Sequence, residues 1–103
     1  MKTLILIISL SILPLLAMSH NDPAVENTIR SEIVYPQNLK ANNVEGDVLV
    51  QFTVAKDGSV SIDQINSSDV SLKEYVVGKL GQMLFGKNDE AKQYNMKFSF
   101  KLL

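Results

Sequence analysis

The stretch DVLVQFTVA at 47–55, followed by KDGS at 56–59, decides the fold of this chain. Apolar side chains take every second position of the first stretch: Val48, Val50, Phe52 and Val54. This period of two is typical of a strand that buries one face. Asp57-Gly58 is a strong signal for a tight turn, because glycine adopts positive φ at little cost. We therefore predict a strand over 47–55 that leads into a β-hairpin.

The partner strand of this hairpin is predicted over 60–66. Its alternation is less regular, since Val60 and Ile62 share one face while Ile65 falls on the other. Such a change of phase predicts a β-bulge or an early end of the strand. The most regular alternation lies near the C-terminus, where we predict a third strand over 94–102.

A first helix is predicted ahead of the hairpin. Asp22-Pro23 combines an N-cap residue with proline at the first helical position, which predicts a helix over 23–33. The helix should end before Tyr35-Pro36, because a residue that precedes proline is pushed toward extended conformations. Residues 37–43 could form one further turn with Leu39 facing inward.

A second helix is predicted between the second and third strands. Ser71 and Glu74 match a capping box, so we place this helix over 72–85 and expect Gly86 to end it. A crossover that passes the first strand would leave that strand in the centre of the sheet and the third strand at an edge. The expected class is α+β, a three-stranded sheet built on an antiparallel hairpin with two helices on one face.

The first 19 residues differ in composition from the rest of the chain. Met1-Lys2 forms a short positive head, Leu4 to Leu16 is an apolar run, and Ala17-Met18-Ser19 offers a cleavage site. We predict a signal peptide over 1–19 and one domain over 20–103, exported to the periplasm. The alternative is an uncleaved anchor that tethers the domain to the inner membrane, but the apolar run is shorter than the roughly 20 residues that a span requires.

The composition excludes several classes of function. The net charge is −1, so the chain has no strong positive field that would attract nucleic acid. The absence of cysteine rules out disulfides and cysteine-based zinc sites. The one histidine, His20, lies at the predicted new N-terminus, and the carboxylates are scattered. We therefore expect no enzyme activity, no catalytic residues, no metal and no cofactor.

The chain resembles the C-terminal domain of TonB, the energy transducer of Gram-negative outer-membrane import. The resemblance covers about 35–102 and rests on the following ordered motifs: Tyr35-Pro36, VEGDV at 44–48 with Gly46 at its centre, Asp57-Gly58, Ile65-x-Ser67-Ser68, Leu80 with Met83-x-Phe85, and Phe98-x-Phe100-x-Leu102. It implies the TonB C-terminal fold, with Tyr35, Pro36, Gly46, Asp57 and Gly58 as structural motif residues.

The chain also departs from this family. Met83 stands where the family usually has tryptophan, and Ile33-Val34 replaces a Gln-Pro element that helps TonB to grip its partner peptide. A working transducer has a membrane helix and a long proline-rich spacer, whereas this chain has three prolines in total. We therefore expect a domain that binds a partner as the TonB domain does, without the membrane helix and the spacer through which a transducer transmits force.

The resemblance implies that the last strand binds an extended peptide by β-augmentation, with a TonB-dependent outer-membrane transporter as the expected kind of partner. The corresponding edge residues are Tyr94, Asn95, Lys97, Ser99 and Lys101. The strict alternation of the strand also favours Tyr94 as a core residue, and the two lysines can equally protect the edge from aggregation. The alternative function is a secreted structural module that forms a homodimer through the same strand.

Overall fold

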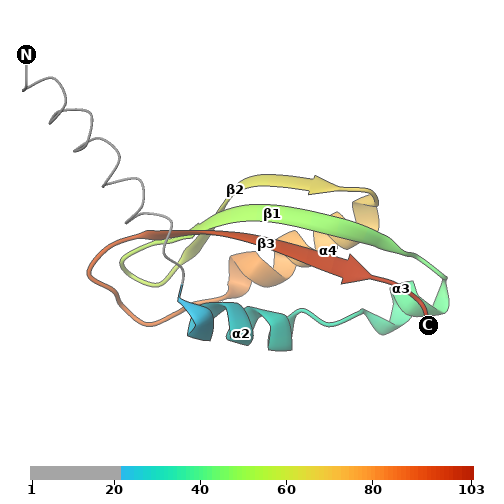
Figure 1. Cartoon of the computed structure of the whole chain (residues 1–103), viewed down its shortest axis with the longest axis horizontal. Coiled ribbons are helices and arrows are strands. Elements are labelled where there is room, and N and C mark those ends of the chain that lie inside the picture. The colour runs from blue at the N-terminus through green and yellow to red at the C-terminus, as the bar shows by residue number, and fades with distance from the viewer. Residues whose placement is uncertain (1–21) are drawn as a thin grey trace, which may run out of the picture.

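The computed structural model describes residues 22–103, and the predicted signal peptide lies outside this range. Three strands form one sheet in the order β2-β1-β3, and both neighbouring pairs are antiparallel. Helices α2 and α4 lie on the same face of this sheet (Figure 1). The elements are α2 (Pro23–Glu32), α3 (Gln37–Ala41), β1 (Gly46–Val54), β2 (Val60–Ser67), α4 (Val70–Gln82) and β3 (Lys92–Phe100). The predicted α+β class, the central position of β1 and the edge position of β3 are confirmed.

The core lies between the sheet and the two long helices. Alternate side chains of β1 and β3 point into it, together with Val25 and Ile29 of α2 and one stripe of α4. Phe52 and Tyr94 are paired directly across β1 and β3, and their rings stack with centroids 5.3 Å apart. Such aromatic pairs add stability beyond the area that they bury. The alternation seen in the sequence thus decides which face of the sheet is buried.

A β-bulge interrupts the pairing of β1 with β2. Gln51 pairs with Gln64 while the next residue, Phe52, pairs with Ile62, so Asp63 has no partner of its own. The extra residue projects its carboxylate to the open face, where Asp63 Oδ2 accepts a 2.6 Å hydrogen bond from the Thr53 hydroxyl. The bulge confirms the phase change predicted for this strand.

The start of α2 matches its prediction, but the start of α4 does not. The Asp22 side chain accepts a 3.0 Å hydrogen bond from the Ala24 amide and caps α2. The predicted capping box at Ser71 is wrong, because Asp69 is the N-cap of α4 and its carboxylate accepts a 2.9 Å hydrogen bond from the Leu72 amide. Asp69 is extended and lies where its side chain reaches the third amide of the helix.

The end of α4 also comes earlier than expected. The helix stops at Gln82 with Met83 as C-cap, so Gly86 does not terminate it. The chain turns away because the Phe85 amide donates a 2.8 Å hydrogen bond to the Gly58 carbonyl, and Leu84 forms an isolated bridge with Ser59. A contact with the distant hairpin turn therefore replaces the last turn of the predicted helix.

The hairpin turn itself depends on Gly58. Its φ is +93°, and a Cβ atom at this position would lie 1.8 Å from the Phe85 carbonyl oxygen. The Asp57 carboxylate closes the turn by accepting hydrogen bonds from the Ser59 amide at 2.9 Å and from its hydroxyl at 2.7 Å. These bonds hold the pKa of Asp57 below its ordinary value.

The remaining connection, α3, is the single turn expected before β1, with Leu39 packed against the core. Among residues 22–103, no helix combines the length and the apolar character that a membrane span requires.

Candidate peptide-binding edge

Among the residues that the structure describes, no strand pairs with the outer side of β3. The Asp47 carbonyl accepts a hydrogen bond from the Ser68 amide, so the backbone groups of Asp47 point away from β3. Because backbone direction alternates along a strand, the groups of Val48 point toward β3 and pair with Phe98. The N–H and C=O groups of the next residue, Lys97, then point outward. By the same alternation, Asn95 and Ser99 also direct their backbone groups to the outer edge.

The structure brings most of the predicted edge residues together. Asn95, Lys97 and Ser99 have exposed side chains that share the open face of the sheet, and Lys101 is exposed just beyond the end of β3. Tyr94 differs, since it is 1% exposed and its backbone pairs with Phe52 of β1. The edge therefore consists of 95–101 without Tyr94, which is a core residue as its alternation predicted.

The two edges of the sheet differ in regularity. β3 pairs with β1 over nine consecutive residues without a break, from Lys92 opposite Val54 to Phe100 opposite Gly46. The other edge, β2, contains the bulge at Asp63. A bulge bends a strand and disturbs the spacing of its outward groups, which makes pairing with a further strand less favourable. The regular edge is the one formed by β3.

Arg30 of α2 is a component of the site that sequence reasoning missed. Its guanidinium lies 5.5 Å from the centroid of the Phe98 ring and donates a 3.2 Å hydrogen bond to the Lys97 carbonyl. In the sequence, Arg30 is spaced for an i,i+4 pair with Glu26 on the solvent side of a helix. No local pattern points to Lys97, because 67 positions separate the two residues.

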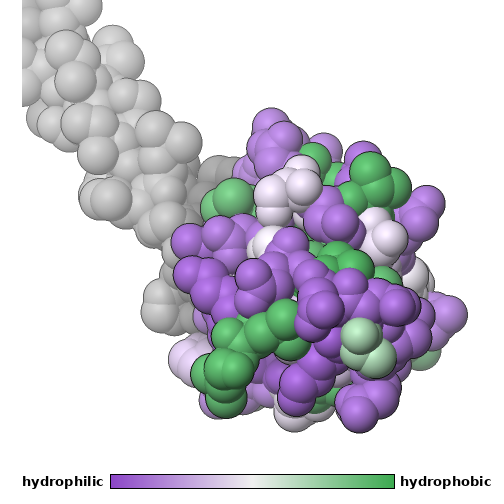
Figure 2. Space-filling view, turned by 90° about the vertical axis from the view of Figure 1, so that its right-hand side faces the viewer, coloured by the Kyte–Doolittle hydropathy of each residue, from purple (hydrophilic) through white to green (hydrophobic). Residues whose placement is uncertain are grey.

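A groove of about 210 Å³ runs beside the C-terminal half of β3. Arg30 and Tyr35 line one side of it, and Ser99, Phe100 and Lys101 line the other. Figure 2 looks onto this end of the molecule, where hydrophilic residues dominate and hydrophobic ones form separate patches.

The motif residue Tyr35 forms the corner between α2 and α3. Its hydroxyl donates a hydrogen bond to the Val44 carbonyl, and its ring packs edge-on against Phe100 with centroids 5.5 Å apart. Partial burial and the nearby Glu45 carboxylate raise the pKa of Tyr35. Pro36 follows as the extended N-cap of α3. The corner thereby fixes α2 relative to the C-terminal end of β3.

Two further contacts hold the ends of the sheet. Glu45 Oε2 accepts a 2.7 Å hydrogen bond from the Leu102 amide, which fastens the chain after β3. A Cβ atom on Gly46 would lie 2.6 Å from the Ser68 hydroxyl oxygen and 3.2 Å from a Leu72 methyl group. The absence of a side chain at Gly46 thus lets α4 approach the start of β1 closely.

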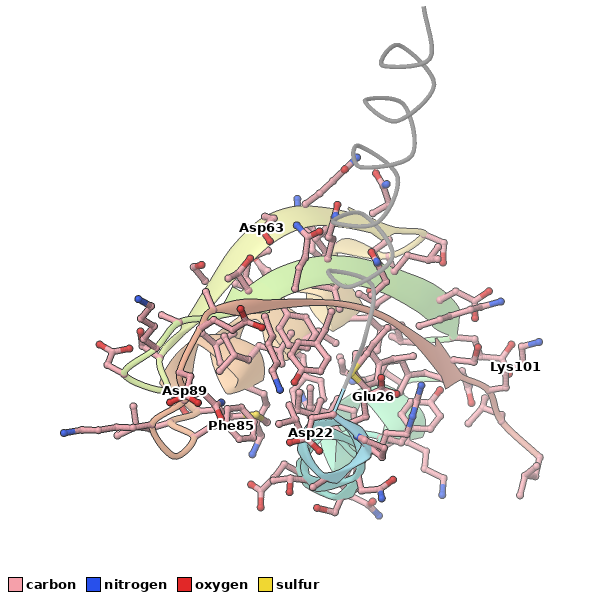
Figure 3. The ribbon with its side chains drawn as sticks, turned by 60° about the vertical axis from the view of Figure 1, so that its left-hand side comes forward. Asp22, Glu26, Asp63, Phe85, Asp89 and Lys101 are labelled. Carbon is pink, nitrogen blue, oxygen red and sulfur yellow. The ribbon has the colours of Figure 1, made fainter. Side chains whose placement is uncertain are left out.

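The opposite, open face of the sheet is polar. A shallow depression of about 310 Å³ on it is lined by Leu49 and by amide side chains that include Gln51, Gln64 and Asn95. Asp63 lies on this face, whereas Asp22 and Glu26 lie on the helix side of the sheet (Figure 3). Within the described part of the chain, no group of three or more His, Cys, Asp or Glu side chains is placed to hold a metal ion.

Comparison with known proteins gives one consistent result. A family model described as the C-terminal region of the Gram-negative bacterial TonB protein matches residues 31–102. An NMR solution structure of the Helicobacter pylori TonB C-terminal domain (residues 179–285) is 26% identical with a TM-score of 0.54, covering 77% of this chain and 78% of that one. A second one (residues 194–285) is 25% identical with a TM-score of 0.50, covering 80% and 96%.

The search of curated proteins finds no match. The matched family consists of interaction modules without catalytic activity, which bind TonB-dependent transporters in the cell envelope. The predicted resemblance over 35–102 is confirmed by the matched range, and most of α2 precedes that range. This chain belongs to the family of Gram-negative TonB C-terminal domains.

Proposed function

We propose that this protein is exported to the periplasm after removal of residues 1–19, and that its domain binds an extended peptide of a TonB-dependent transporter or a similar envelope protein. The peptide adds as a fourth strand to the outer side of β3. The observation that supports this most directly is that β3 is an edge strand of the sheet within residues 22–103 and keeps an unbroken register with β1 over nine residues. Strand addition at such an edge is an established mode of peptide recognition.

The backbone groups set the strength of this interaction. Asn95 and Ser99 each direct one N–H and one C=O group outward, and Lys97 directs its N–H group outward while its C=O group accepts a hydrogen bond from Arg30. Each new hydrogen bond contributes about 0.5–1.5 kcal/mol after exchange with water. Ordering a flexible peptide offsets much of this gain. We therefore expect reversible binding in the micromolar to millimolar range, suited to a partner that must be released.

A pair of substitutions at Asn95 tests strand addition. Asn95→Pro removes an outward N–H group and leaves the bonds between β1 and β3 in place, since proline is tolerated at strand edges when its nitrogen faces solvent. Asn95→Ala removes the same side chain but keeps the N–H group. We expect peptide affinity to fall about tenfold in the proline variant and to change little in the alanine variant.

The measurement is fluorescence anisotropy with labelled peptides taken from the N-terminal segments of TonB-dependent transporters. Thermal unfolding of both variants checks that they fold. Equal affinities of the two folded variants would contradict strand addition at β3. Sedimentation without peptide separates the alternative function, because a homodimer through β3 would appear at high protein concentration and would also be weakened by Asn95→Pro.

A further inference from the structure

The segment that follows α4 leaves the helix where the sequence favours a further helical turn. Met83 and Leu84 lie three and four positions after the buried Leu80, so a helix that continued would place both side chains next to it. Gly86 is a suitable C′ residue for such a helix. In the structure the helix ends at Gln82, Met83 is extended with ψ 146°, and the Leu84 side chain is 75% exposed. A large apolar side chain thus lies in solvent although another backbone conformation would cover it.

Contacts with the hairpin turn compensate for the missing helical turn. The Phe85 amide donates a 2.8 Å hydrogen bond to the Gly58 carbonyl, and the Asn88 amide donates a 3.0 Å hydrogen bond to the Lys56 carbonyl. The Phe85 side chain is half-buried and packs against the core. The close approach requires glycine at 58, because a Cβ atom there would lie 1.8 Å from the Phe85 carbonyl oxygen. A single position of the turn therefore decides whether 83–85 can stay extended.

The extended segment and a continued helix have favourable contacts of the same kind. In a continued helix the Leu84 amide would donate a hydrogen bond to the Leu80 carbonyl. The Phe85 amide would likewise bond to the Gly81 carbonyl, and these two bonds would replace the two to the hairpin turn. Packing would change in opposite directions, because Leu84 would leave solvent while Phe85 would leave the core. Since gains and losses offset each other, the helical conformation falls in the range of about 0.1–10% that is typical of minor states.

We propose that residues 83–86 form a two-state element at the end of α4. In the major state 83–85 are extended and bound to the hairpin turn. In the minor state they wind onto α4, and Gly86 takes the left-handed conformation of a C′ residue. This element lies in a different part of the fold from the peptide-binding edge and goes beyond the proposed function.

Winding of the segment would change two neighbouring features. A hollow of about 320 Å³ lies between α2 and the end of α4, and Met83, Leu84 and Phe85 contribute to its lining. Figure 3 shows Phe85 beneath the sheet, on the side of the helices. Winding would move these three residues and reshape the hollow. It would also break the bond from Asn88 to Lys56, which holds the loop that leads into β3. The state of 83–86 therefore sets the mobility of the connection between α4 and β3.

Two glycine substitutions shift the equilibrium in opposite directions. Gly58→Ala blocks the extended state through its clash with the Phe85 carbonyl oxygen. Gly86→Ala leaves the extended state free, because the φ of Gly86 is not positive there and no atom lies within 4 Å of the added Cβ atom. It strains the helical state, since alanine is disfavoured in the left-handed conformation. The ratio of helical to extended molecules should fall about five- to thirtyfold in Gly86→Ala.

Chemical-exchange saturation transfer on isotope-labelled protein measures both states. In the wild type we expect a minor state with helical ¹³Cα shifts at 83–85, which weakens about five- to thirtyfold in Gly86→Ala. In Gly58→Ala the main signals of 83–85 should become helical, and the Asn88 amide should exchange faster with water. Gly78→Ala is the matched control, because position 78 is helical in both states and has equal space for a Cβ atom. It should leave the ratio unchanged.

Several results would overturn the two-state element. These are the absence of a minor state at 83–85, a minor state without helical shifts, and a minor state that responds equally to Gly86→Ala and Gly78→Ala. If Gly58→Ala fails to fold, the wild type and the other two variants still decide. None of these measurements uses a peptide, so a negative result leaves strand addition at β3 intact.

Discussion

Replacement of Gly58 by alanine tests the contact between the hairpin turn and the segment around Phe85, which follows α4. Two independent problems arise at this position. The backbone has φ +93°, where an alanine residue is strained by about 1–2 kcal/mol. The new Cβ atom would also lie 1.8 Å from the Phe85 carbonyl oxygen, a backbone atom that cannot rotate away.

The clash forces the hairpin turn and the segment around Phe85 apart. Separation breaks the hydrogen bonds from the Phe85 amide to Gly58 and from the Asn88 amide to Lys56. At about 0.5–1.5 kcal/mol for each bond, and with the backbone strain added, Gly58→Ala should lower the free energy of unfolding by roughly 2–5 kcal/mol. Small domains have total stabilities near the lower end of about 5–15 kcal/mol, so this loss is large.

Urea unfolding followed by circular dichroism measures the change. Gly58→Asn separates the two problems, because asparagine tolerates positive φ better than alanine but adds the same Cβ atom. We expect it to destabilise somewhat less than Gly58→Ala. Gly78→Ala is the matched control, since no atom lies within 4 Å of its added Cβ and alanine should stabilise α4 by about 0.5–1 kcal/mol. A Gly58→Ala stability within about 0.5 kcal/mol of wild type would refute this reasoning.

Three other predictions concern single groups. Asp69→Ala should lower the free energy of unfolding by about 1 kcal/mol because it removes the N-cap of α4, whereas Ser71→Ala should change it by less than about 0.5 kcal/mol; denaturant titration compares the two. The pKa of Asp57 is lowered by its hydrogen bonds to Ser59, so its stabilising effect is complete above its ordinary pKa of 3.8 and is lost as the pH falls through the lower folded value. Ser59→Ala should move the Asp57 pKa upward in an NMR titration, and an unchanged pKa would show that the hydroxyl has no part in the shift. Tyr35→Phe should destabilise the protein by about 1 kcal/mol, because the Val44 carbonyl loses its partner while the packing on Phe100 stays; a thermal unfolding curve that matches wild type would contradict the hydrogen bond.

The local parts of the fold could be predicted from the sequence. The hairpin at Asp57-Gly58 and the alternation of β1 and β3 depend on neighbouring residues, so their strands were placed to within a few positions. The bulge was also predictable, since Ile62 and Ile65 differ in phase. Its position at Asp63 required the register with β1.

The errors arose where distant residues decide the structure. Asp69 and Ser71 are both good N-caps, and only the turn that leads out of β2 determines which of them the helix uses. The early end of α4 depends on the bond from Phe85 to Gly58, which no local pattern contains. The position of Arg30 at the edge of β3 also depends on distant residues, because the packing of α2 under the sheet brings Arg30 to Lys97.

The measurement that tests the central claim most directly is an NMR titration of the labelled domain, residues 20–103, with a transporter-derived peptide. We expect the amides with outward groups on β3, those of Asn95, Lys97 and Ser99, to shift progressively and to gain protection from hydrogen exchange. The outward amide of Ile65 on the bulged edge should stay unchanged. Shifts confined to β2, or no shift on β3 at millimolar peptide, would contradict the claim that β3 is the binding edge.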